Sequence, residues 1–209
     1  MFRPFKSYSG EGEDAVSNRL FKGKTTGFYV DVGCFHPVVV SNTYHLYRRG
    51  WRGINIDVDQ FKVDVFNRLR RRDKNICVAV SDQEGEAEFY FHSGETYGSM
   101  SGLDRSEAER RAKALGLSVL SRTVKTLPLS AILAAENVSK IDYLTVDVEG
   151  AEEAVLSTID FDVVDIDVLA IEIHGDYDAV LGSGVYRLLS SKGYEIVAWT
   201  PPTVFFRQK

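Results

Sequence analysis

The sequence has few cysteines and no long hydrophobic run, and both deficits limit what the protein can be. Among its 209 residues only Cys34 and Cys77 carry thiols; both lie in apolar, strand-like segments, and no metal-ligand spacing links them. Two reduced thiols fit a cytoplasmic protein best. Residues 1–10 lack the apolar core of a signal peptide, and no stretch approaches the ~18 apolar residues of a membrane span. We therefore expect no integral membrane segment.

The sequence also lacks an excess of positive charge. Its formal net charge is −5, which argues against the broad basic footprint of a nucleic-acid-binding protein. One basic run occurs at residues 68–74 (RLRRRDK), and we interpret it as a solvated helix end, where cations favour the helix dipole. We expect a small-molecule or glycan partner rather than nucleic acid. Nothing in the sequence indicates the oligomeric state.

The apolar segments that are present alternate with amphipathic ones, which predicts an α/β fold with a mostly parallel sheet and helices on both faces. The last two strands, around Pro201 and Pro202, are expected to form an antiparallel hairpin. The predicted strands are residues 28–32, 53–58, 76–81, 86–91, 122–126, 141–148, 168–173, 194–199 and 204–207. The predicted helices are residues 11–21, 43–49, 60–71, 106–115, 129–136, 151–156 and 177–192, the last broken near 182–184.

The length suits one domain, residues 1–209. Residues 1–27 are expected to form an N-terminal cover segment. Residues 92–122 are expected to form a lid or substrate insertion, because their first part (HSGETYGSMSGL) is rich in glycine and serine and has no periodicity. Within that loop, Tyr97, Ser99 and Met100 are candidates to close over a substrate.

The most informative segments are residues 28–37 (FYVDVGCFHP) and 53–57 (GINID). The first predicts a buried strand that turns at Gly33, and the second predicts its neighbour, ending at Asp57. A glycine turn beside a carboxylate at the carboxyl edge of a parallel sheet is typical of a nucleoside pocket. Dinucleotide sites also need further glycines to cradle a diphosphate, but Phe35 and Pro37 stand there instead. This favours an adenosine ligand without phosphate, such as S-adenosylmethionine, over a nicotinamide dinucleotide. The alternative is a flavodoxin-like fold in which Asp31 caps a turn.

In the methyl-donor interpretation each strand end has a role. Asp31 and Gly33 would lie beneath the methionine end of the donor, and Asp57 would accept hydrogen bonds from the ribose hydroxyls. Five further residues are candidates to contact the donor: Glu13, Asn42, Ser81, Asp82 and Asp147. Helix starts and ordinary turns also explain the first four. Asp14 is a weaker candidate beside Glu13.

Four polar side chains follow two later strands of the predicted sheet. They are Asp147 and Glu149 after one strand, and Glu172 and His174 after the other. Parallel neighbours place all four on one edge, near the expected position of the donor methyl. Asp147, Glu172 and His174 could bind a divalent cation such as Mg²⁺. Without a metal, His174 is the natural base and Glu149 a nearby carboxylate. Alternatively, Glu172 only bonds the next loop.

Several short motifs together resemble the FkbM-type family of S-adenosylmethionine-dependent methyltransferases. They are GED at 12–14, VDVG at 30–33 with His36 and Pro37, SNT at 41–43, GWRG at 50–53, VSD at 80–82 and DVEGAE at 147–152. The resemblance implies a Rossmann-like class I methyltransferase fold with a seven-stranded sheet, and methylation of a hydroxyl oxygen on sugars or secondary metabolites. Two positions depart from the family pattern: Asp57 replaces a glutamate and Thr145 a lysine.

We therefore expect an S-adenosylmethionine-dependent O-methyltransferase that acts on a hydroxyl of a sugar, a glycan or a secondary metabolite. One alternative is an N- or carboxyl-methyltransferase on the same scaffold. Another is a catalytically inactive donor-binding or scaffold protein.

Overall fold

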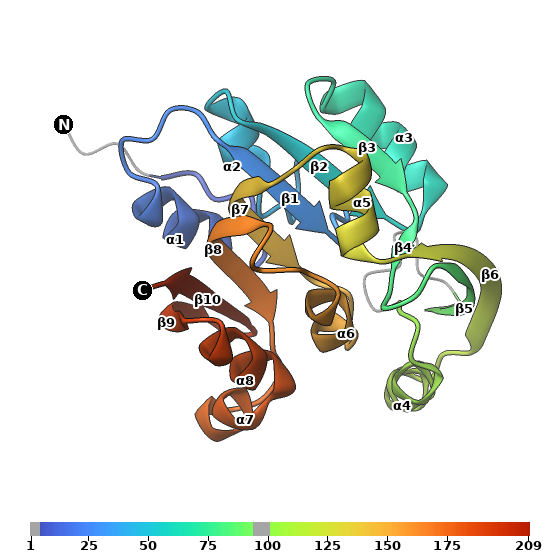
Figure 1. Cartoon of the computed structure of the whole chain (residues 1–209). Coiled ribbons are helices and arrows are strands. Elements are labelled where there is room, and N and C mark those ends of the chain that lie inside the picture. The colour runs from blue at the N-terminus through green and yellow to red at the C-terminus, as the bar shows by residue number, and fades with distance from the viewer. Residues whose placement is uncertain (1–4, 94–100) are drawn as a thin grey trace.

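The computed structural model describes residues 5–93 and 101–209, in which two β-sheets and eight helices occur (Figure 1). The larger sheet has seven strands in the order β3-β2-β1-β7-β8-β10-β9. Its strands are β1 (Phe28–Val32), β2 (Arg52–Asp57), β3 (Lys74–Cys77), β7 (Lys140–Val146), β8 (Asp165–Glu172), β9 (Tyr194–Thr200) and β10 (Thr203–Gln208).

The predicted mixed topology is confirmed. Strands β3, β2, β1, β7 and β8 run parallel. Strand β10 pairs antiparallel with both β8 and β9, so the chain ends in the expected hairpin, with a turn at Pro201 and Pro202. Because the five parallel strands end on the same edge, the segments that follow β1, β2, β7 and β8 meet there.

Alternate residues of the central strands pack into two separate cores, which is why helices cover both faces. Leu144 and Val146 of β7 belong to the larger core, whereas Tyr143 belongs to the smaller one. The larger core also takes apolar side chains from α5 (Leu129–Ala135), α6 (Glu152–Ser157), α7 (Tyr177–Gly182) and α8 (Gly184–Ser191). The smaller core takes them from α1 (Glu13–Leu20) and α2 (Tyr44–Arg48). Helix α3 (Gln60–Leu69) packs against β2 and β3.

The predicted strand over residues 76–81 is wrong as a single element. The run divides into β3 and β4 (Ala79–Val80), which belong to different sheets. The chain leaves the large sheet at Val78 because β4 pairs in parallel with β6 (Val119–Leu127), and the Ser81 amide donates to the Leu127 carbonyl at 3.1 Å. Strands β4, β6 and β5 (Gly85–His92) form the second sheet.

Helix α4 (Arg105–Leu115) accompanies the second sheet, and Figure 1 places both to one side of the large sheet. His92 joins them, since its Nε2 lies 2.9 Å from the Ala108 carbonyl oxygen. The predicted insertion at 92–122 thus covers α4 and part of β6. Its residues Tyr97, Ser99 and Met100 lie outside the described residues, and the single-domain organisation stays a prediction. None of the described helices has the length and apolar composition needed to cross a bilayer.

Candidate functional site

A cavity of about 410 Å³ opens at the carboxyl edge of the large sheet. Its walls come from the turns after β1, β2 and β7, and from β4 and β5 of the second sheet. Seven of the candidate site residues line it: Glu13, Asp31, Gly33, Asn42, Asp57, Asp147 and Glu149. A cavity thus lies at the sheet edge that the sequence predicts, although the sequence did not indicate its complete wall.

The turn after β1 is shaped by a very close approach between two strand ends. Gly33 has φ +80°, and a Cβ atom there would lie 1.8 Å from the Asp147 carbonyl oxygen, so no side chain fits. The Gly33 and Cys34 amides both donate to the Ile56 carbonyl. Phe35 has φ +49°, a left-handed conformation that costs energy for a residue with a side chain. The turn therefore takes a glycine-like path although its second glycine is absent.

Asp31 is held at the base of the cavity by hydrogen bonding and burial. It is 5% exposed, and its Oδ2 accepts a 2.7 Å hydrogen bond from the Thr43 hydroxyl. Burial raises its pKa to about 6, while the Thr43 bond and the positive charge of Arg70 act in the opposite direction. Because burial disfavours the charged form of Asp31, a positively charged ligand nearby would stabilise that form.

Arg70 lies behind this wall and corrects our interpretation of the basic run. It is fully buried rather than solvated. Its guanidinium donates to the Pro37 carbonyl at 2.7 Å and to the Ser41 hydroxyl at 2.9 Å, and Asp73 lies 3.5 Å away. Arg70 thus fixes both ends of the loop at residues 37–43, which carries Asn42 into the cavity.

Asp57 lies at the tip of β2, as predicted, and is 6% exposed. Its Oδ1 accepts from the Asp59 amide at 2.9 Å, and its Oδ2 accepts from the Phe35 amide at 3.2 Å and from Lys62 Nζ at 3.4 Å. Burial raises its pKa, and the Lys62 charge offsets part of that rise. The protein therefore keeps a shielded acceptor at the place expected for a ribose.

Ser81 and Asp82, two of the candidates to contact the donor, are not among the lining residues; their side chains bond each other at 3.1 Å. Apolar side chains from the ends of β2 and β3 and from β4 and β5 line the cavity instead: Val58, Val78, Val80 and Phe89. Phe89 comes from β5, and its alternation with exposed glutamates in residues 86–91 (EAEFYF) marked it only as a strand residue.

Two further expected contacts have different outcomes. Asn42 lines the cavity, and its Nδ2 donates to the Thr145 hydroxyl at 3.3 Å. Asp14 does not line it, because its carboxylate accepts hydrogen bonds from Ser7, Ser9 and the Tyr8 amide. Asp14 thus ties the N-terminal segment to α1. His36 is likewise outside the wall; its Nδ1 accepts from the Val38 and Val39 amides.

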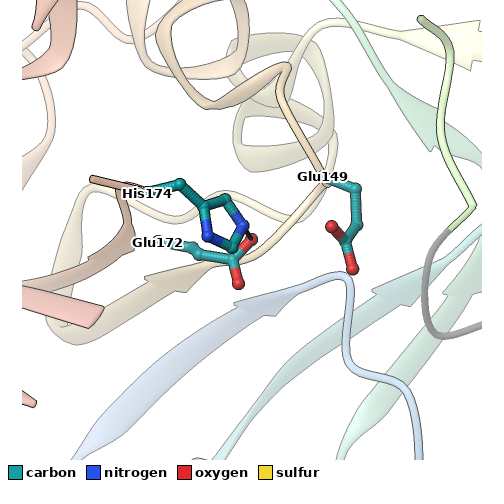
Figure 2. A group of neighbouring side chains, drawn as sticks. All are labelled: Glu149, Glu172 and His174. Atoms are coloured by element: carbon teal, nitrogen blue, oxygen red, sulfur yellow. Dashed lines mark ion pairs between the residues drawn. The ribbon is translucent and has the colours of Figure 1, made fainter. Parts of the chain in front are cut away.

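The acidic edge beside the cavity brings together residues from the ends of β7 and β8 (Figure 2). Ligand atoms of Glu149, Glu172 and His174 all lie within 4.8 Å of one another, and those of Asp147, Glu152 and Glu172 form a second such group. The expected set of Asp147, Glu172 and His174 is therefore divided between two groups that share Glu172. Glu152 is engaged elsewhere as well, because it accepts from the Val148 and Gly150 amides.

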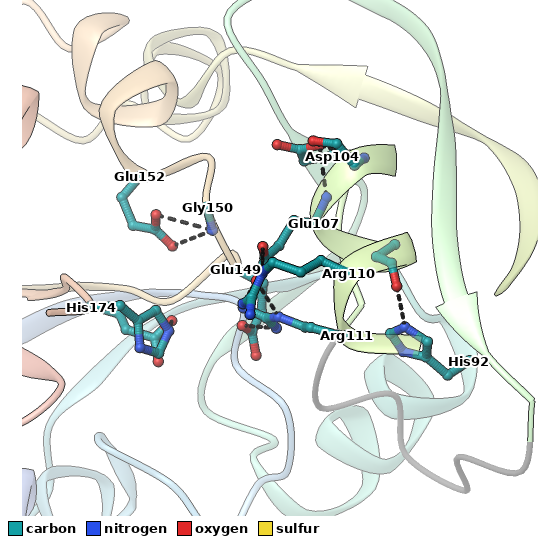
Figure 3. Close-up of polar contacts among 12 residues, drawn as sticks. His92, Asp104, Glu107, Arg110, Arg111, Glu149, Gly150, Glu152 and His174 are labelled. Carbon is teal, nitrogen blue, oxygen red and sulfur yellow. Dashed lines mark hydrogen bonds and ion pairs between the residues drawn. The ribbon is translucent and has the colours of Figure 1, made fainter. Parts of the chain in front are cut away.

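Within this edge, Glu172 and His174 form a contact of 3.3 Å between Oε2 and Nε2. The His174 side chain is 62% exposed, whereas that of Glu172 is 12% exposed. Burial and the nearby Glu149 charge raise the pKa of Glu172 to about 7. Glu149 has φ +58° and forms an ion pair with Arg111 of α4 (Figure 3). A carboxyl and an imidazole therefore lie next to the cavity wall that Glu149 provides.

The chain matches the model of the methyltransferase FkbM domain over residues 31–196, which is most of its length. It belongs to this family of S-adenosylmethionine-dependent methyltransferases. The order of its large sheet agrees with the expected class I methyltransferase fold. A search of curated protein sequences found no match.

Several solved structures are distantly similar to the chain. A TehB-like methyltransferase from Corynebacterium glutamicum is 11% identical, with a TM-score of 0.48 over 95% of this chain and 88% of that one. A precorrin 8W decarboxylase from Methanobacterium thermoautotrophicum is 14% identical, with a TM-score of 0.45 over 99% and 93% of the two chains. A human methyltransferase 10 domain-containing protein is 12% identical, with a TM-score of 0.43 over 92% and 75%. Similarity at this level carries no functional argument.

Proposed function

We propose that the protein transfers a methyl group from S-adenosylmethionine to a hydroxyl of a sugar, a glycan or a secondary metabolite. The observation that carries the proposal is that Glu149 belongs both to the wall of the donor cavity and to the group with Glu172 and His174. A donor in the cavity and a hydroxyl beside Glu172 and His174 would therefore both lie next to the Glu149 side chain. Methyl transfer needs this in-line alignment and a group that removes the hydroxyl proton.

The charges of the cavity wall fit such a donor. Five carboxylates line it, at Glu13, Asp31, Asp57, Asp147 and Glu149, against the single cation of Lys62 among the described lining residues. This excess of negative charge favours a sulfonium with an adjacent ammonium group. Asp57 supplies acceptors for the ribose, and the apolar side near Phe89 suits a flat base. Gly33 itself contributes no side chain to the wall, because a Cβ atom there would lie 1.8 Å from the Asp147 carbonyl oxygen.

The donor supplies an electrophilic methyl group on sulfur, and the chain supplies alignment and proton removal. In our proposal, the His174 imidazole accepts the proton of the attacking hydroxyl. Glu172 orients the ring through the contact of Oε2 with Nε2, and Glu149 fixes the acceptor against the cavity. One C–O bond forms, one C–S bond breaks, and the proton leaves through the exposed imidazole.

A divalent cation such as Mg²⁺, if it takes part, would be held at the same edge. Its ligands would be Glu172 and His174 with Glu149, or Glu172 with Asp147, because these are the groups whose oxygen and nitrogen atoms converge. Hard oxygen ligands suit Mg²⁺. The test is turnover after exhaustive dialysis against a chelator, with and without added Mg²⁺. Unchanged turnover in metal-free buffer would exclude this role.

The first experiment is calorimetric titration with S-adenosylhomocysteine of the wild type and of Asp57→Ala, with and without Mg²⁺. We expect micromolar binding by the wild type and at least tenfold weaker binding by the variant. The matched control is Asp82→Ala, which removes an acid outside the cavity and should bind like the wild type. Absence of binding by the wild type in every condition would refute the methyltransferase proposal.

The acceptor screen then separates the alternatives. Methylation of amines or carboxylates, but of no hydroxyl, would favour the N- or carboxyl-methyltransferase. Donor binding without turnover, unaffected by His174→Ala, would favour a scaffold role. A non-nucleic-acid acceptor is supported only by the net charge of −5, so the screen includes RNA. The cytoplasmic location likewise stays a prediction.

A further inference from the structure

Lys62 is a cation in a cavity wall dominated by carboxylates. It lies in the first turn of α3, it is 7% exposed, and it lines the donor cavity. Its Nζ lies 3.4 Å from Asp57 Oδ2 and 5.0 Å from the centre of the Phe35 ring. A lysine is rarely this deeply buried unless its charge is paired. Its position beside Asp57 therefore requires an explanation.

Asp57 and Lys62 differ in how much of their hydrogen-bonding capacity is occupied. Asp57 already accepts from the Asp59 amide, the Phe35 amide and Lys62, which leaves about one of the roughly four acceptor positions of a carboxylate. Lys62 has three N–H donors. Among the described residues, its one recorded hydrogen-bond acceptor is Asp57 Oδ2, at the long distance of 3.4 Å. Spare donor capacity therefore lies beside spare acceptor capacity.

This combination matches the chemistry of a hydroxyl group, which both donates and accepts. A ribose hydroxyl next to Asp57 could give its proton to the carboxylate and receive an N–H from the ammonium group. Because a carboxylate only accepts hydrogen bonds, Asp57 alone would leave the oxygen lone pairs of that hydroxyl unpaired in a buried site. Such unpaired groups reduce affinity.

We propose that Lys62 is a second ribose-recognition residue of the donor pocket, donating to the oxygen of the hydroxyl whose proton Asp57 accepts. This inference rests on the donor pocket of the proposed function. It makes the pocket selective for a nucleoside with an intact ribose hydroxyl at that position. In this proposal, Lys62 binds the ribose of the donor and not the carboxylate of its methionine part.

The test is a double-mutant cycle in which the lysine amine and the ligand hydroxyl are removed singly and together. Calorimetry compares the wild type and Lys62→Met with three ligands: S-adenosylhomocysteine and its 2′-deoxy and 3′-deoxy analogues. We expect Lys62→Met to weaken binding of S-adenosylhomocysteine at least tenfold. For one of the deoxy analogues, the wild type and the variant should bind within twofold of each other, because the contacted hydroxyl is missing. Lys74→Met, at a lysine that is 57% exposed, controls for loss of charge.

Equal weakening for all three ligands would overturn the proposal, because it would mean that Lys62 only keeps Asp57 ionised and in place. Unchanged affinity for all three would overturn it too. If Lys62→Met does not fold, as judged by thermal unfolding, Lys62→Leu carries the same comparison, because it also removes every donor of the lysine. Failure of the wild type to bind S-adenosylhomocysteine would instead count against the proposed function.

Discussion

Arg111 of α4 forms an ion pair with Glu149, just after the end of β7, and so joins α4 to the acidic edge of the large sheet (Figure 3). Both side chains are largely buried, at 13% and 17% exposure. Arg111 also bonds Glu107 one turn away at 2.6 Å. Burial raises the pKa of Glu149, and the hydrogen bond and charge of Arg111 oppose that rise. The pair therefore places a cation against Glu149, where the cavity wall meets the group of Glu172 and His174.

We predict that Arg111→Met lowers kcat/KM at least tenfold while leaving the Kd for S-adenosylhomocysteine within twofold. The donor contacts of the other walls remain, but Glu149 loses the partner that fixes it in its left-handed conformation. The matched control is Arg110→Met, since Arg110 also bonds Glu107 but is exposed and lies on the same helix. An equal decrease in kcat/KM for the two variants would show that a general change in α4, and not loss of the ion pair with Glu149, lowers the activity.

A second prediction concerns the close approach between the β1 turn and β7. Gly33→Ala should abolish donor binding or folding, because its Cβ would meet the Asp147 carbonyl oxygen at 1.8 Å. Gly23→Ala separates this clash from conformational strain: Gly23 has a similar φ of +86°, but open space surrounds the position of its Cβ. The control should lose only about 1–2 kcal/mol, the usual cost of the left-handed conformation for a residue with a Cβ. Thermal unfolding and calorimetry measure both, and wild-type behaviour of Gly33→Ala would refute the steric argument.

The residues that the sequence located well are those at the ends of strands. Asp31, Asp57 and Asp147 follow apolar runs, and parallel pairing brings the ends of such runs to one edge. For the same reason, Glu149, Glu172 and His174 were expected together, and they lie together.

The residues that the sequence did not locate depend on contacts between distant segments. Phe89 reaches the cavity because the chain leaves the large sheet at Val78 and forms a second one, and no local pattern signals this change. Ser81 and Asp82 lose their expected place for the same reason. Arg70 sits among exposed arginines, so only tertiary packing distinguishes it from them. Lys62 has the spacing of an ordinary helix residue, and its role becomes visible only beside Asp57.

The buried position of Arg70 gives a third prediction. Its guanidinium stacks near the rings of Tyr44, Tyr47 and Phe66 and bonds the loop at residues 37–43. Arg70→Met leaves Asp73 without its cation in a buried site, and such losses typically cost about 3–5 kcal/mol. We expect that decrease in the free energy of unfolding, measured by denaturant titration. Arg71→Met, at an exposed neighbour, should change it by less than about 0.5 kcal/mol. If the free energy of unfolding decreases no more for Arg70→Met than for Arg71→Met, the contacts of Arg70 do not stabilise the fold as predicted.

The final prediction is a pH dependence of donor binding that originates at Asp31. The carboxyl of the free protein has a pKa of about 6, because burial disfavours its charged form; Arg70 acts to lower that pKa, and Asp73 and Asp57 act to raise it. A positively charged donor prefers ionised Asp31, so binding below pH 6 must release a proton. Affinity for S-adenosylmethionine should therefore rise up to tenfold per pH unit below pH 6 and become level above about pH 7.

Calorimetry between pH 5 and 8 measures this dependence. Asp31→Asn should flatten the profile, because no proton is left to release at that position. Thr43→Val should move the rise to higher pH, since the Thr43 hydrogen bond lowers the pKa of Asp31. The same shift lowers the free energy of unfolding as the pH rises from 3.8, the ordinary pKa of an aspartate, to about 6. Over this range the folded state still holds a proton that the unfolded chain has already released. A profile that is identical in the wild type and in Asp31→Asn would assign the dependence to another group and would remove Asp31 from the donor site.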